Sequence, residues 1–134
     1  MRKIYSKVDP SVLLHIVNRI SDINGRTDIV PDDEFLQLAT LSLSKGTTFR
    51  PHKHIKVEKV TTIAQESWVV LKGSVKCFFY DLDDTIIAED ILGVGDCSIT
   101  LRGGHNYLIL DDNTIVYEFK TGPYLGQQLD KTFI

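Results

Sequence analysis

The chain has 134 residues, a length typical of one domain that buries a hydrophobic core without disulfide bonds or metal ions as supports. Hydrophobic residues make up 43% and charged residues 25% of it, proportions that disfavour a disordered, collagen-like or coiled-coil chain. The net charge is −3, with 15 Lys and Arg against 18 Asp and Glu, and no basic block stands out, so we expect no nucleic-acid partner.

No stretch approaches the ~20 apolar residues that cross a bilayer, and the first residues lack the apolar region of a signal peptide. We therefore expect a cytoplasmic protein that does not contact a membrane. The two cysteines, Cys77 and Cys97, lie in apolar surroundings without CxxC spacing. We interpret them as buried thiols rather than as a disulfide or a zinc cluster.

The first predicted element is a short amphipathic α-helix over residues 10–22. Asp9 and Pro10 suit the N-cap and the first helical position. Apolar residues then recur at helical spacing at Val12, Leu13, Ile16, Val17 and Ile20. His15 on this helix is expected to be an ordinary surface side chain. With a polar connector after Gly25, residues 1–33 form the N-terminal helix and connector, and residues 34–134 form the β domain.

From residue 34 onward the pattern changes to short β-branched and aromatic runs separated by turn residues, which predicts about eight strands. The predicted strands are Phe35–Ser44, Thr47–Phe49, Ser67–Leu71, Val75–Tyr80, Thr85–Ile91, Ser98–Leu101, Tyr107–Leu110 and Thr114–Lys120. The short turns leave no room for crossover helices. The strands should therefore pair antiparallel in a sandwich, jelly roll or barrel.

Three histidines and one acid are the candidate metal ligands. His52 and His54 are two residues apart, so on an extended strand both imidazoles project from the same face and can share one ion. Taken alone, this spacing is equally consistent with a metal site and with two surface histidines that have no function. Glu66 opens an apolar strand, an unusual place for a charge unless it is paired or ligating. His105 follows a Gly-Gly turn that lets the backbone approach a site.

Arg50 and two tyrosines are further candidates around these ligands. Arg50 lies on the same strand face as the two histidines, where it either reaches an anionic ligand or packs at the rim. Tyr107 is two residues from His105, and Tyr107, Tyr117 or Arg50 could transfer protons or bind an anion. Trp68, two residues after Glu66, fits a pocket wall and a core position equally well.

The spacing of these residues resembles the two sequence motifs of the cupin superfamily. As in the first motif, five residues separate Gly46 from His52, and six separate Glu66 from Gly73. The gap between His54 and Glu66 is longer than usual, which leaves Glu58 as a rival to Glu66. In the second motif, Leu101 and Ile109 replace a proline and an asparagine, and His105 comes one residue early.

Within the superfamily, residues 30–134 resemble the WbuC-type cupin-fold metalloproteins, often encoded with surface-polysaccharide genes. The segments that carry this likeness are Arg50–His54, Glu66–Gly73, Glu118–Tyr124 and Asp130–Phe133. The resemblance implies an all-β jelly-roll barrel, here with a short N-terminal helix, and a homodimer. It also implies one divalent metal ion, of the Fe, Mn, Ni, Zn or Co type, held by His52, His54, Glu66 and His105.

The resemblance also implies a function in surface-polysaccharide metabolism. A metal-dependent enzyme would act on a small polar substrate such as a sugar or sugar nucleotide, by isomerase-like, epimerase-like or other Lewis-acid chemistry, with Tyr107 and Arg50 as its catalytic residues. A non-catalytic sugar- or metal-binding module is the alternative. A metal that only stabilises the fold is a third interpretation, and the sequence does not separate the first two.

Overall fold

Ten β-strands and two short helical turns make up the computed structural model, which describes residues 1–134. The strands are β1 (Arg2–Tyr5), β2 (Leu13–Asn18), β3 (Arg26–Asp28), β4 (Ala39–Leu41), β5 (Glu66–Lys72), β6 (Val75–Tyr80), β7 (Ile86–Leu92), β8 (Cys97–Thr100), β9 (His105–Ile109) and β10 (Ile115–Lys120). The helical turns are η1 (Ile20–Asp22) and α1 (Gln127–Asp130). Neither helix is long and apolar enough to span a membrane.

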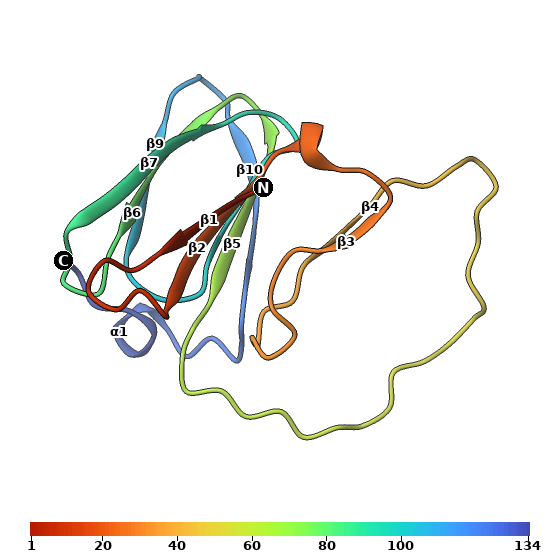
Figure 1. The fold of residues 1–134 in the computed structure, drawn as a ribbon, viewed down its shortest axis with the longest axis horizontal. Coiled ribbons are helices and arrows are strands. Elements are labelled where there is room, and N and C mark those ends of the chain that lie inside the picture. Colours follow the sequence, from red (N-terminus) through yellow and green to blue (C-terminus); the bar gives the residue numbers. More distant parts are fainter.

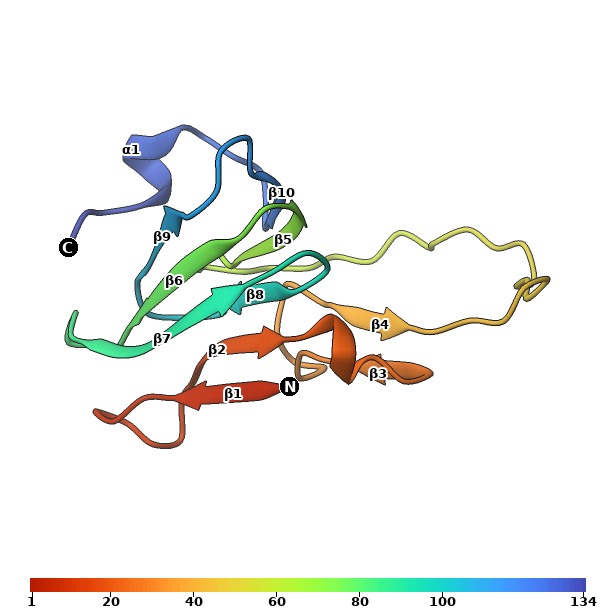
Figure 2. The same ribbon diagram turned by 90° about the horizontal axis from the view of Figure 1, so that it is seen from above.

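The strands form three antiparallel sheets. The largest has the order β1-β2-β8-β5-β10, the second has the order β7-β6-β9, and β3 pairs with β4 in a small hairpin. The two larger sheets lie on opposite sides of the body (Figures 1 and 2). The prediction of a mainly β protein with antiparallel strands is thus confirmed. The predicted closed barrel is not found, because the sheets share no strand.

Two hydrophobic cores hold these layers together. The inner core lies between the two larger sheets and draws side chains from β1, β2, β5, β6 and β7, with Phe79 and Leu92 fully buried. The outer core lies on the other face of the largest sheet, where Ile29 and Val30 cover Ile16 and Ile99. The largest sheet is therefore buried on both faces around β2 and β8. Cys77 and Cys97 are free, buried thiols, as predicted.

The predicted N-terminal helix is wrong, because residues 13–18 form β2. This strand lies between β1 and β8, and all six of its residues are buried. Val17 packs in the inner core and Ile16 in the outer core. A strand buried on both faces does not alternate between apolar and polar residues, so its apolar run imitates a helical spacing. Only the three-residue turn η1 is helical in this region.

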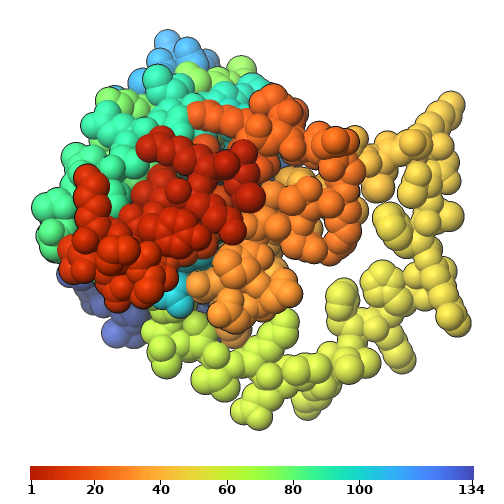
Figure 3. All heavy atoms as spheres, in the orientation of Figure 1, coloured from red at the N-terminus to blue at the C-terminus, as the bar shows by residue number.

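Six of the predicted strands correspond closely to β5–β10, whereas the segment before them departs from the prediction. Residues 35–44 contain only the three-residue strand β4, and the predicted strand Thr47–Phe49 is absent. Residues 42–64 contain no strand or helix and extend away from the body (Figure 3). The histidine pair His52 and His54 is thus not on a strand.

His15 is fully buried in β2, so its assignment to the surface is wrong. Its Nε2 atom lies 2.9 Å from the carbonyl oxygen of Tyr80, and its Nδ1 atom lies 3.1 Å from the Thr100 hydroxyl. Because a carbonyl only accepts, Nε2 carries the proton and Nδ1 accepts from Thr100. Any side chain at Gly103 would collide with that Tyr80 carbonyl and approach the imidazole, which explains the glycine there.

The buried imidazole predicts a pH-dependent stability. Burial lowers the pKa of His15 from 6.5 to about 4. Between these values the unfolded chain binds more protons, so the free energy of unfolding falls as the pH drops from 6.5 toward 4. We expect a loss of about 2 kcal/mol between pH 7 and pH 5 from this group. Urea denaturation at the two pH values measures it.

The variant His15→Gln, which cannot titrate, should lose most of this pH dependence. The double variant His52→Gln/His54→Gln removes two exposed imidazoles and should keep it, which makes it the matched control. An unchanged difference between pH 7 and pH 5 in His15→Gln would show that another group is responsible.

Candidate functional site

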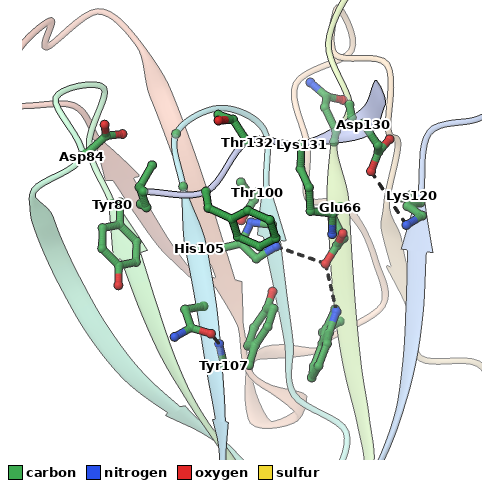
Figure 4. A pocket seen from close by; sticks show the side chains of 18 of the residues that line it. Glu66, Tyr80, Asp84, Thr100, His105, Tyr107, Lys120, Asp130, Lys131 and Thr132 are labelled. Atoms are coloured by element: carbon green, nitrogen blue, oxygen red, sulfur yellow. Dashed lines mark hydrogen bonds and ion pairs between the residues drawn. The ribbon is translucent and has the colours of Figure 1, made fainter. Parts of the chain in front are cut away.

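A pocket of about 690 Å³ opens at the end of the sandwich where β5 and β9 begin. Its walls come from both larger sheets, and the C-terminal residues 127–134 lie across it (Figure 4). Strand alternation explains the lining, because residues two apart on a strand face the same side. The side chains that reach the pocket in this way are Glu66 and Trp68 from β5, His105 and Tyr107 from β9, and Glu118 and Lys120 from β10.

Glu66 and His105 meet inside this pocket, one from each sheet. The Nε2 atom of His105 lies 3.1 Å from Oε1 of Glu66. The indole nitrogen of Trp68 donates to the same oxygen at 3.0 Å and lies 3.2 Å from Oε2 of Glu118. Figure 4 shows the Glu66 carboxylate facing the His105 imidazole, to which a dashed line joins it. Since the carboxylate accepts, Nε2 of His105 carries the proton and Nδ1 is left without a protein partner.

Glu66 is held in its ionised form. Burial of its side chain raises the pKa of Glu66, but the hydrogen bond from His105 and the other favourable contacts of the carboxylate together lower it by more. The charge of Lys131 and the indole donor add to this lowering, so the pKa lies below its ordinary range. At neutral pH the site therefore presents a carboxylate that orients a neighbouring imidazole. This arrangement suits proton transfer to or from a bound molecule.

The charge of the pocket is negative. Five carboxylates line it, against two lysines, and one of these lysines is already engaged. Lys120 lies 3.3 Å from a Glu118 oxygen and 4.0 Å from an Asp130 oxygen. The lining carboxylates are Glu66, Asp81, Asp84, Glu118 and Asp130. This field favours neutral or cationic ligands over anionic ones.

Tyr107 forms a wall of the site. Its ring stacks on Trp68 with 3.9 Å between the ring centroids and an angle of 11° between the planes. Its hydroxyl lies 3.0 Å from the Ser98 hydroxyl. Burial strongly raises the pKa of Tyr107, so its phenol stays protonated. The expected proton-transfer role has no geometric support here, because the hydroxyl is bonded to Ser98 rather than to His105 or Glu66.

The other predicted site residues lie elsewhere. Arg50, His52, His54 and Glu58 are exposed in residues 42–64. The two imidazole rings have centroids 5.6 Å apart, and Nδ1 of His52 lies 3.1 Å from the Arg50 carbonyl oxygen. Tyr117 is exposed on β10 and does not line the pocket.

The structure thus brings together Glu66 and His105, but not His52 and His54. No group of three or more His, Cys, Asp or Glu side chains has an arrangement that could hold a metal ion. The four predicted ligands, as placed, do not fit a metal centre, and we derive no chemical step through a metal.

Several lining residues were not predicted from the sequence. Glu118 and Lys120 could have been found, because they alternate with outward-facing residues on a predicted strand and lie on one face of it. Asp130 and Lys131 carry no such signal. They reach the pocket only because the C-terminal segment turns back across it, a path that local sequence patterns do not encode.

Comparisons with known proteins leave the family open. No family model matches the chain, and no solved structure matches it. One curated protein, an ATP-dependent helicase/nuclease component from Natranaerobius thermophilus, is 24% identical over 117 residues. This alignment covers 87% of the chain but only 9% of that much longer protein. Such a partial likeness does not establish a family.

Proposed function

We propose that the pocket binds a small, polar, uncharged molecule such as a sugar, and that Glu66 and His105 exchange a proton with it. The observation that carries this proposal is the carboxylate–imidazole pair inside a polar pocket, with Nε2 of His105 3.1 Å from Oε1 of Glu66. The volume of about 690 Å³ suits a ligand of sugar size.

The electrostatics of the lining support a neutral ligand rather than a sugar nucleotide. The phosphates of a nucleotide would meet five carboxylates and two lysines, of which Lys120 is already paired. Bringing anions into such a field costs free energy without a compensating pair. Hydroxyl groups, in contrast, both donate to carboxylates and accept from ammonium groups.

The proton transfer can be followed atom by atom. In the neutral imidazole Nε2–H donates to Glu66, so Nδ1 of His105 is the free basic nitrogen, and it accepts a proton from a carbon next to the carbonyl of an open-chain sugar. The Glu66 carboxylate stabilises the imidazolium that forms. Return of that proton to the neighbouring carbon, while the hydroxyl proton moves from one oxygen to the other, completes an aldose–ketose isomerisation.

A second candidate is a metal-binding protein of the cupin type, as the sequence resemblance implies. It is supported by one observation: two of the four expected ligands, Glu66 and His105, share the pocket. A divalent ion there would need further donors, which the sequence motif assigns to His52 and His54 on the exposed segment. A non-catalytic binding module uses the same pocket without proton transfer.

Trp68, the only tryptophan in the chain, reports on the pocket. Because its indole contacts Glu66 and Glu118, ligand entry should change its fluorescence. We expect a saturable change with neutral hexoses and hexosamine derivatives, and at least tenfold weaker binding of the matching nucleoside-diphosphate sugars. Tighter binding of the nucleotide forms would contradict the neutral-ligand proposal.

Removing either member of the pair should sharply reduce turnover. General acid–base catalysis contributes roughly 10²–10⁴-fold, so Glu66→Gln and His105→Gln should each lose activity on that scale in an NMR assay of deuterium exchange at the sugar carbons. Glu89→Gln, which removes an exposed carboxylate paired with Lys76, is the control. Saturable binding without exchange in the unmodified protein would favour the binding module.

Elemental analysis of protein purified without added metal tests the second candidate. A cupin-type centre predicts about one divalent ion per chain, which His52→Ala, His54→Ala, Glu66→Ala and His105→Ala should each reduce severely. Glu58→Ala should leave it unchanged. Metal-free protein that still binds sugars and exchanges the sugar proton would rule this candidate out.

A further inference from the structure

Residues 42–64, here called the arm, are an exposed extension whose few contacts with the body lie near its two ends. Every arm residue except Thr61 is exposed, and the apolar side chains include Ile55 and Val60, which are 81% and 80% exposed. Figure 3 shows the arm standing clear of the body. Structureless loops of this length are uncommon in compact domains, and exposed apolar groups of this kind mark interaction sites.

The arm has the opposite charge to the rest of the chain. It contains five basic residues and one acidic residue, a net charge of +4. Because the whole chain carries −3, the remaining residues carry −7. The basic residues are Lys45, Arg50, Lys53, Lys56 and Lys59, and the acidic residue is Glu58. The arm and the body are therefore electrostatically complementary, which favours contact between two copies of the chain.

The body offers an open edge for an extended segment. β9 pairs only with β6, and β10 pairs only with β5, so these consecutive strands end their two sheets without pairing with each other. Unpaired strand edges present free N–H and C=O groups that accept a further strand. Leu108 on β9 and Tyr117 on β10 are exposed beside this edge, and the acidic pocket borders it.

The other edges suit the arm less well. β1 ends the largest sheet on its far side and carries Arg2 and Lys3, which repel a basic segment. β7 ends the smaller sheet, but its Asp90 is already paired with Arg2 and Arg19. The side formed by β9 and β10 is therefore the favourable acceptor.

We propose that the arm of one copy adds as a strand to the free edge of β9 on a second copy, and that the reciprocal contact forms a two-fold dimer. The arm cannot easily reach this edge on its own chain. Ser42 donates to the Gly25 carbonyl at 2.8 Å, and buried Gln65 accepts from Leu36 and bonds through its backbone to Thr121 after β10, so both roots of the arm are fixed to the body. Figures 1 and 2 show the arm on the side opposite β9. The proposal does not depend on the ligand of the pocket.

Crosslinking between two variants that each carry one added cysteine tests the contact directly. Ile55→Cys is placed on the arm and Leu108→Cys on β9, and the two proteins are mixed and treated with a bismaleimide. The native cysteines are buried, so they do not compete. We expect a covalent heterodimer, with at least a tenfold lower yield when Ile86→Cys on β7 replaces Leu108→Cys. Ile86 and Leu108 are equally exposed at 51%, which makes this a matched control.

Charge reversal on the arm tests the electrostatic contribution to the proposed dimer contact. Sedimentation should give a dimer for the unmodified chain, and Lys53→Glu/Lys56→Glu/Lys59→Glu should weaken it at least tenfold. Lys3→Glu/Lys7→Glu/Lys72→Glu makes the same total charge change on exposed body residues and should leave the dimer intact. The proposal is overturned if the unmodified chain is a monomer, or if both triple variants weaken the dimer equally. It is also overturned if the Ile55→Cys/Leu108→Cys double variant forms an intrachain crosslink while the mixture of the two single variants gives no heterodimer.

Discussion

The contact between Glu66 and His105 is the interaction on which the functional account depends, because it joins the two sheets at the open end of the sandwich. Glu66 begins β5 in the largest sheet and His105 begins β9 in the smaller one, so the pair exists only if the sheets face each other in the observed way. The inner core fixes that arrangement. Phe79 of β6 is fully buried in it and lies 4.8 Å, ring centroid to ring centroid, from His15 of β2.

The same packing explains why a pocket forms at this end. Farther along the strands, apolar side chains such as Val70 and Val75 fill the space between the sheets. At the strand ends, polar residues replace them and the C-terminal segment crosses above. The result is a polar pocket on an apolar base, in which Glu66 is partly desolvated yet stays ionised. Such a balance is typical of groups that exchange protons with a ligand.

Much of the fold from β5 onward could be predicted from the sequence, because those strands are separated by tight turns. The partnership of Glu66 and His105 was also anticipated, although from motif spacing rather than from geometry. The N-terminal strands were missed because β2 is buried on both faces and lacks alternation. The burial of His15 depends on contacts with Tyr80 and Thr100, far away in the chain, which no local pattern encodes.

His52 and His54 show where the comparison with a sequence motif fails to predict the position of side chains. Their two-residue spacing implies a shared face only if the segment is a strand, and residues 42–64 form none within the single chain. Pairing with another strand edge is what would make them extended.

Nitrogen-15 NMR of histidine-labelled protein near neutral pH tests the contact between Glu66 and His105 most directly. The variant His15→Gln identifies the signals of the buried His15 ring. We expect His105 in the Nε2–H tautomer, with a hydrogen-bonded ring proton whose signal shifts or is lost in Glu66→Gln. A His105 ring that exchanges freely between tautomers and does not respond to Glu66→Gln would contradict it.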